Sequence, residues 1–137
     1  MESSAVAAWL LGQSNGAIVH DLLERADNVF SSDLLLIECD RALIRAESAG
    51  LVSAADAAAR RAELARASVY WTLLRIEGEV LERARRPFPL EPVRSLAAVH
   101  LSTLLVVRSI FADTDVLSFD DRVQQNAKAL GFALAGA

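Results

Sequence analysis

The chain is poor in cysteine, proline and aromatic residues, and it has no long apolar run. Of its 137 residues, one is cysteine, three are proline and 6% are aromatic. Because a single cysteine cannot form an internal disulfide, Cys39 fits a reducing compartment. No stretch approaches the ~20 apolar residues that a membrane-spanning helix needs, and no basic segment of a secretory signal precedes the first apolar stretch. We therefore expect a cytoplasmic protein with no membrane segment.

Positive charge is also in short supply, since 14 Lys and Arg residues stand against 18 Asp and Glu. The net charge of −4 argues against a protein that coats nucleic acid through charge alone. It leaves open a nuclease whose own site is acidic. With 53% hydrophobic residues, the chain is long enough to bury a core, and we expect a single domain over residues 1–137.

Helical and strand patterns alternate along the whole chain. We expect strands at residues 28–31, 70–76, 116–119 and 132–135, and helices at 5–11, 18–25, 32–49, 53–67, 79–85, 95–108 and 121–130. Strands that alternate with helices predict a parallel sheet covered by helices on both faces. Ligands of such sheets bind at the carboxyl ends of the strands, so functional residues should lie where a strand ends and a helix begins.

Several local signals set the expected helix ends. Ser53 with Asp56 three residues later predicts a capping box, and Gly50 suits the end of the preceding helix. Ser32 and Ser95 are candidate N-caps of their helices. Residues 70–76 are rich in β-forming side chains, which predicts a buried strand.

Three acidic residues occupy the expected strand ends or their neighbourhood. Glu2 precedes the first helix, and Asp120 follows the strand at 116–119, with Asp121 as a candidate N-cap. Glu38 falls on the apolar side of its helix, where a carboxylate is costly unless a charged group meets it. Arg41, one turn further on, could supply that charge.

One imidazole lies within a nearly apolar helix. The segment LAAVHLS at residues 96–102 contains His100, and no second His or Cys stands at metal-ligand spacing from it. Ala97, one turn before His100, offers it no polar partner. We therefore interpret His100 as a core residue whose partner the sequence does not reveal.

Carboxylates that converge at one sheet edge repel one another, and Mg²⁺ or Mn²⁺ commonly compensates. Such an ion can polarise a phosphodiester and lower the pKa of a bound water. Taken singly, each acid also has an ordinary interpretation: Glu2 in a frayed terminus, Glu38 in a surface ion pair and Asp120 in a helix cap.

Four segments occur in an order that matches a known family. They are ESSA at residues 2–5, SSDLLLIE at 31–38, LAAVHLS at 96–102 and LSFD at 117–120. In this order the chain resembles PIN-domain ribonucleases, in particular the VapC-like toxins of bacterial toxin–antitoxin pairs.

The resemblance implies a three-layer α/β/α fold around a central parallel sheet, and an endoribonuclease that uses Mg²⁺ or Mn²⁺. By this resemblance Glu2, Glu38 and Asp120 would be the metal-binding and catalytic residues, with Ser4 and Asp121 in support. It further implies an RNA substrate, a cognate antitoxin protein and a homodimer.

The chain departs from the family pattern at two places. Ala97 stands where the family has its third acid, and Met1 alone precedes the first acid, which is Glu rather than Asp. We expect either a truncated first strand or a start codon that is assigned too late. These departures support an alternative function, a degenerate PIN module that binds an antitoxin or RNA without cutting it. An unrelated α/β domain with ordinary caps and ion pairs is a third interpretation.

Overall fold

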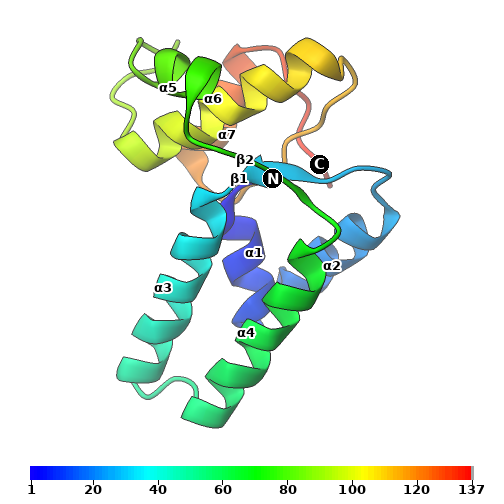
Figure 1. Cartoon of the computed structure of the whole chain (residues 1–137), viewed down its shortest axis with the longest axis vertical. Coiled ribbons are helices and arrows are strands. Elements are labelled where there is room, and N and C mark those ends of the chain that lie inside the picture. The colour runs from blue at the N-terminus through cyan, green and yellow to red at the C-terminus, as the bar shows by residue number, and fades with distance from the viewer. Residues whose placement is uncertain (137) are drawn as a thin grey trace.

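The computed structural model describes residues 1–136 and shows a mixed α/β protein (Figure 1). Its elements follow one another as α1 (Ser3–Leu10), α2 (Gly16–Arg25), β1 (Phe30–Ser32), α3 (Leu34–Ser48), α4 (Ala54–Ser68), β2 (Thr72–Leu74), α5 (Gly78–Ala84), α6 (Ser95–Ile110) and α7 (Asp121–Ala129). All seven helices lie within the ranges that the sequence predicted or differ from them by a few residues at the ends.

The two strands form a small parallel sheet, which confirms the predicted parallel pairing. Phe30 lies opposite Thr72 and Ser32 opposite Leu74. The antiparallel helices α3 and α4 connect the two strands, as a parallel crossover requires. Figure 1 shows the sheet in the middle of the molecule, with α1 to α4 below it and α5 to α7 above it.

The predicted strands at 116–119 and 132–135 are wrong as strands. They are reduced to an isolated parallel bridge between Val116 and Leu134. Two bonds of 2.9 Å make this bridge, from the amide of Val116 to Ala133 O and from the amide of Ala135 to Val116 O. Both segments are extended, but the pairing is too short to form a ladder.

The start of the chain links the sheet to this bridge. The Met1 nitrogen donates to Phe30 O at 2.8 Å, and the amide of Glu2 donates to Leu117 O at 2.9 Å. Residues 1–2 are thus extended backbone lying between β1 and Leu117. Burial lowers the pKa of the Met1 ammonium to about 6, against the opposing attraction of Glu2.

The predicted buried strand at residues 70–76 is wrong in both length and burial. Only Thr72–Leu74 pair, and Tyr70 is 87% exposed. Tyr70 belongs to the turn that follows α4, since its amide donates to Ala67 O. Because β2 pairs with β1 on one side only, it is an edge strand, and its other side has no strand partner among the described residues.

The helix caps follow the sequence in one case and differ in three. Ser53 accepts the amide of Asp56 at 3.0 Å, as predicted. Ser32 is not the N-cap of α3, because Asp33 holds that position, although Ser32 Oγ accepts the amide of Leu34 at 3.2 Å. Ser95 is not the cap of α6, because Arg94 holds that position. Asp121 is not the cap of α7 either: this role falls to Asp120, one residue earlier.

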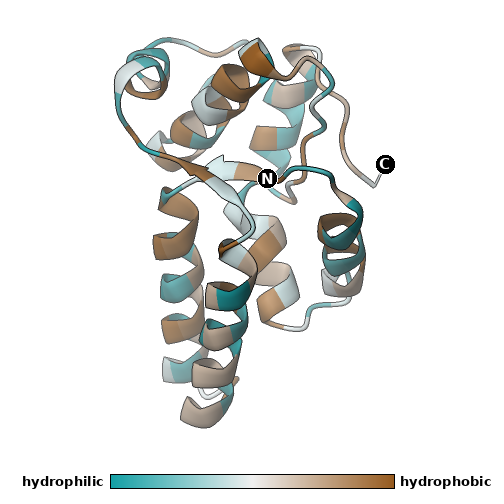
Figure 2. Ribbon diagram, turned by 45° about the vertical axis from the view of Figure 1, so that its right-hand side comes forward, coloured by the Kyte–Doolittle hydropathy of each residue, from teal (hydrophilic) through white to brown (hydrophobic). Residues whose placement is uncertain are grey.

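The core consists of clusters on both sides of the sheet. One packs α6 and α7 around Leu101, Val123 and Phe132, and another packs α1 against α3 through Val6 and Leu35. Helix α6 is apolar on most of its surface (Figure 2), which allows it to bury one side against the sheet and others against α5 and α7. Within residues 1–136, every helix is too short or too polar to cross a membrane.

Gly16 permits the close approach of α2 to α1, because a Cβ there would lie 2.8 Å from Ala8 O and 2.9 Å from Trp9 Cα. Helix propensity alone would make Gly16→Ala stabilising by up to about 1 kcal/mol. We expect the clash to prevail, so that Gly16→Ala lowers the free energy of unfolding by about 1–3 kcal/mol in urea denaturation. Ala17→Ser, at the exposed next position, is the control, and a stabilised Gly16→Ala variant would contradict the rigid contact.

Candidate metal centre

Glu2 is a buried carboxylate held by hydroxyl groups. It occupies the N-cap position of α1 and is 8% exposed. Ser3 Oγ and Ser118 Oγ donate to its carboxylate, each at 2.7 Å, and Ser4 Oγ donates to the same oxygen as Ser118. The supporting contact predicted for Ser4 is therefore present, and Ser118 and Ser3 add two that the sequence did not single out.

These hydroxyls decide the ionisation of Glu2. Burial by itself raises the pKa of a carboxyl group because it penalises the charge. Here the three donated hydrogen bonds and the nearby His100 outweigh that penalty, so the pKa of Glu2 lies below its usual value. Glu2 is consequently a carboxylate at neutral pH, although it is almost out of contact with solvent.

Glu38 finds its partner on another helix. Its Oε2 lies 2.5 Å from Nε2 of His100, which joins α3 to α6 across the middle of the molecule. The His100 side chain is 3% exposed and that of Glu38 21%. The prediction that Glu38 turns inward is confirmed, and the side chain that it meets is His100 and not Arg41.

The three side chains form one group. One ligand atom from each of Glu2, Glu38 and His100 lies within 4.8 Å of the others. The elements responsible are the start of α1, the second turn of α3, and α6. Since α3 starts two residues after β1 ends and Glu2 lies beside Leu117, the group lies close to the carboxyl end of β1, as parallel-sheet sites do.

This donor set suits a divalent cation. Two carboxylates and one imidazole are ligands that Mn²⁺ and similar ions accept, whereas Mg²⁺ prefers oxygen alone. Nδ1 of His100 is buried and has no hydrogen-bond partner among the described residues, whereas Nε2 faces the Glu38 carboxylate, which favours a proton on Nε2. To bind a cation, Nε2 would have to release this proton and give up its hydrogen bond to Glu38.

Asp120, the third predicted acid, has a different role in the structure. Its Oδ1 accepts the amide of Val123 at 2.8 Å and so caps α7. It is linked to the cluster only indirectly, because its amide donates to Ser118 Oγ, which in turn donates to Glu2. Asp120 and Asp121 are both exposed, and neither belongs to the converging group within residues 1–136.

Ala97 lies one turn before His100 on α6 and is half-buried against the core. Its methyl group offers no ligand atom to the cluster. Cys39, next to Glu38, contributes no ligand either. Burial and the charges of Glu38, Asp40 and Glu2 raise the pKa of its thiol to about 12, which keeps it protonated in the core.

A second group of potential ligands lies on the surface of α2. His20, Asp21 and Glu24 are within the same distance limit, but all three are exposed. Nε2 of His20 lies 3.6 Å from Oε1 of Glu24, and the two residues are one helical turn apart on the exposed side of α2. Such a group is typical of a solvated helix face.

His100 is the member of this group that the sequence left without a role. The signal was available, because a buried imidazole and an inward-facing carboxylate both needed a partner. What was missing was the spatial link between residues 62 positions apart.

No family model matches the chain, and no curated protein matches it.

Ser118→Ala tests whether hydroxyl groups keep Glu2 ionised. We expect the pKa of Glu2 to rise, measured by NMR titration of its side-chain carboxyl, because one of three donors is lost. The folded-state pKa of Glu2 lies below the unfolded one, so its ionisation stabilises the fold above the unfolded pKa and this contribution disappears as pH falls. Ser118→Ala should therefore lower the free energy of unfolding by about 2 kcal/mol at neutral pH, and by less in acid.

Ser109→Ala is the matched control, since Ser109 Oγ donates only to Val106 O at the exposed end of α6. If the pKa of Glu2 is unchanged in Ser118→Ala, the serine hydroxyl groups do not govern the ionisation of Glu2.

Proposed function

We propose that the protein is a PIN-like endoribonuclease of the VapC type that depends on a divalent cation. The observation that carries this proposal is the meeting of Glu2 and Glu38. These are the first two acids in the motif order of the resemblance, they are 36 positions apart in the chain, and their carboxylates converge.

The architecture supports the same proposal. Helices lie on both sides of the sheet (Figure 1). Residues 1–2 bond to Phe30 and Leu117, and Val116 and Leu134 form a further parallel bridge. Together they are consistent with a three-layer α/β/α arrangement in which most strands are short.

Glu2 and Glu38 would hold the cation, with His100 as a further ligand. When bound, the ion would polarise an RNA phosphodiester and lower the pKa of a water molecule. The remaining side chains have supporting tasks. Ser3, Ser4 and Ser118 orient Glu2 and keep it charged, and Asp120, beside Ser118, is a candidate for approach to the substrate once its own cap bond is released.

A non-cutting function has one specific observation in its favour, which is Ala97. At this position on α6 a carboxylate would lie one turn from His100, on the same side of the helix. Its absence, together with the use of Asp120 as a cap, reduces the number of oxygen ligands. The second candidate function is therefore a degenerate module that binds RNA or an antitoxin without cleaving it.

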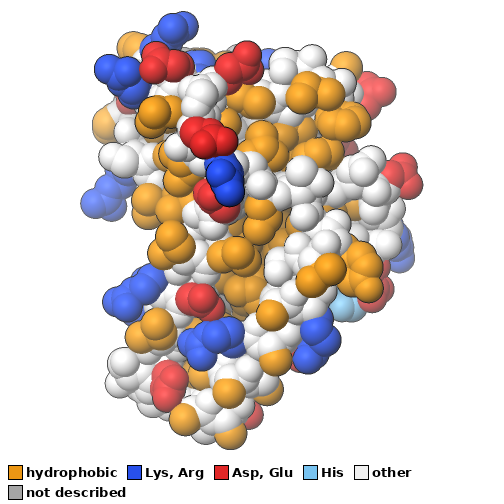
Figure 3. Space-filling model, in the orientation of Figure 1, with side chains coloured by type: hydrophobic (Ala, Val, Ile, Leu, Met, Phe, Trp, Pro, Cys, Tyr) orange, Lys and Arg blue, Asp and Glu red, His pale blue; other side chains and the backbone are white. Residues whose placement is uncertain are grey.

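Partners follow from the resemblance alone. An antitoxin protein, a second copy of the chain and an RNA substrate are each part of the proposal. Exposed apolar side chains are available for protein contacts, among them Ile37 and Ile44 on one side of α3. Figure 3 shows hydrophobic side chains gathered along the middle of one face of the molecule, as protein-binding surfaces often have.

Cation binding is the first test of the site. We expect calorimetry to show that Mn²⁺ binds more tightly than Mg²⁺, because imidazole favours Mn²⁺. Glu38→Gln should weaken Mn²⁺ binding by at least about tenfold, since even the loss of a supporting residue has an effect of this size. Glu47→Gln, on the exposed surface of the same helix, should bind Mn²⁺ with the affinity of the wild-type chain. Equal affinity in the two variants would exclude Glu38 as a ligand.

RNA cleavage by the chain and by Ala97→Asp tests the catalytic proposal. Both are assayed with Mn²⁺ or Mg²⁺, with EDTA as a control. We expect Ala97→Asp to cleave at least about tenfold faster, because an added carboxylate supplies a missing ligand to the cation. Ala97→Asn is the control, because the Asn side chain has the size of Asp but no charge. We expect this variant to show little of the gain in cleavage rate.

The result also separates the two candidate functions. Cleavage by the unchanged chain supports the ribonuclease, and cleavage by Ala97→Asp alone supports the binding module. If neither folded protein cleaves while both bind Mn²⁺, the ribonuclease proposal is wrong.

A further inference from the structure

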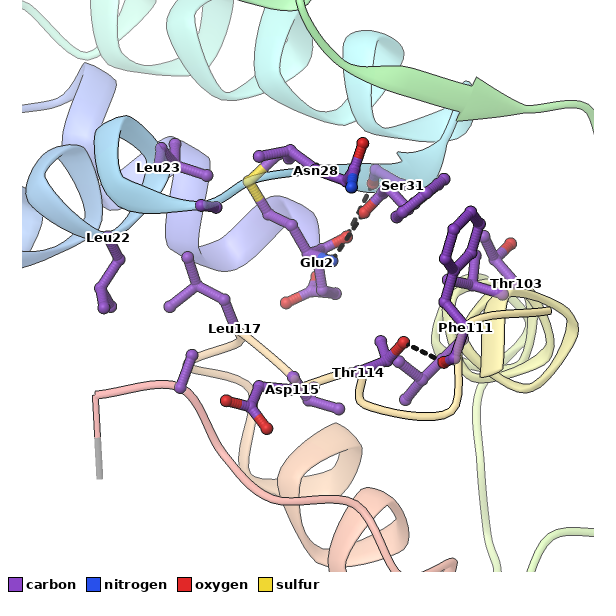
Figure 4. Close-up of a pocket in the computed structure, with 18 of the residues that line it drawn as sticks. Glu2, Leu22, Leu23, Asn28, Ser31, Thr103, Phe111, Thr114, Asp115 and Leu117 are labelled. Carbon is purple, nitrogen blue, oxygen red and sulfur yellow. Dashed lines mark hydrogen bonds between the residues drawn. The ribbon is translucent and has the colours of Figure 1, made fainter. Parts of the chain in front are cut away.

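The structure has a cavity that is separate from the candidate metal centre. One cavity, of about 450 Å³, contains Glu2 and belongs to that centre (Figure 4). The other, of about 820 Å³, is lined by residues of α2, by the end of α4 with the turn that follows it, and by Trp9 of α1. Its lining includes none of Glu2, Glu38 and His100. Its volume is within the range of about 300–1,000 Å³ that is usual for ligand-binding pockets.

Aromatic rings are concentrated in this second cavity. The chain has two tryptophans and one tyrosine, and all three, Trp9, Trp71 and Tyr70, line it together with His20. The ring centroids of Trp9 and His20 are 5.7 Å apart. Trp9 and Trp71 are half-buried and pack against the core, which holds their rings in place. The Tyr70 side chain is exposed, so its ring remains available to a ligand.

The charged side chains around the cavity are mainly acidic. Three carboxylates and one guanidinium line it, those of Glu24, Asp27, Glu63 and Arg66. Within residues 1–136, Asp27 and Glu63 form no ion pair, and Glu24 has only its exposed contact with His20. A cavity with this excess of negative charge attracts cations and repels phosphate groups. Tryptophan and tyrosine also stack on nucleic acid bases, but the carboxylates disfavour a nucleic acid strand here.

We propose that this cavity binds an arginine side chain of a partner protein, presented in a segment with apolar neighbours. A guanidinium group is planar, stacks on aromatic rings and donates several hydrogen bonds to carboxylates. The cavity offers both kinds of contact. This proposal is independent of the proposed ribonuclease function.

Two features favour a protein segment over a small guanidinium compound. A single arginine side chain fills only part of a cavity of about 820 Å³, so the occupant must carry further groups. The remaining lining is aliphatic and suits apolar neighbours of the arginine, since it consists of Leu23, Ala26, Val29 and Ala67. The acidic side chains Glu24, Asp27 and Glu63 are exposed, so a segment can reach them from solvent.

Tryptophan fluorescence tests the proposal directly, because both tryptophans of the chain line the cavity. The full chain is titrated with a short blocked peptide that has one arginine between two leucines. A second peptide has citrulline, which keeps the shape of arginine and lacks its charge. We expect a saturable change in emission with the arginine peptide and at least about tenfold weaker binding of the citrulline peptide. A lysine peptide should bind several-fold more weakly than the arginine peptide, because its ammonium group is not planar.

Variants of the chain locate the binding. Tyr70→Ala should weaken binding of the arginine peptide about five- to tenfold, and Tyr70→Phe, which keeps the ring, by no more than about twofold. Val69→Ala is the control, because Val69 is exposed next to Tyr70 and does not line the cavity. Glu63→Gln should also weaken binding several-fold, whereas Glu47→Gln, on the exposed surface of α3, should not.

Three results would overturn the proposal. The first is equal binding of the arginine and citrulline peptides, or no change in emission with either. The second is binding of blocked arginine alone as tight as that of the peptide, since the occupant would then be a small guanidinium compound. The third is displacement of the peptide by single-stranded RNA that itself changes the emission, because the cavity would then bind bases.

Unchanged affinity in both Tyr70→Ala and Glu63→Gln would place the peptide elsewhere and would equally contradict the proposed site. Circular dichroism of each variant checks that the fold is retained.

Discussion

Two hydrogen bonds made by the backbone of Met1 and Glu2 link the β1–β2 sheet to the segment that forms the bridge at Val116. One reaches Phe30 of β1 and the other reaches Leu117. Helix α6, which packs against β1, makes a second link between these parts. The side chain of Glu2 starts from this same point, so the position of the candidate metal centre depends on the pairing of the chain's first residues.

Buried charge is the second constraint on this region. Glu2 and Glu38 meet it in different ways, the first through three serine hydroxyls and the second through His100. Each solution stabilises a carboxylate where solvent has little access. Two carboxylates within 4.8 Å of one ring nitrogen still carry an excess of negative charge, which a divalent cation would balance. Structural demand and proposed function therefore use the same residues.

Mixed α/β folds support many unrelated activities, so the fold alone does not carry the ribonuclease proposal. It depends on particular side chains: Glu2 and Glu38 at the meeting point, Ser4 and Ser118 behind Glu2, and the gap at Ala97. The capping bond of Asp120 means that the third predicted acid would have to exchange one partner for another during function. That exchange, and the methyl group at Ala97, are the two features in which this site differs from a complete set of acids.

The sequence by itself determined the order of the helices, the parallel pairing of the first two strands, the cap at Ser53 and the inward direction of Glu38, because each follows from the periodicity or the local order of the chain. Only the tertiary structure decided that His100 meets Glu38 and that the predicted last two strands shrink to one bridge. These outcomes depend on how closely distant segments approach. The spacing of residues along the chain carries no information on the distance between Glu38 and His100, because the packing of α6 against the sheet sets that distance.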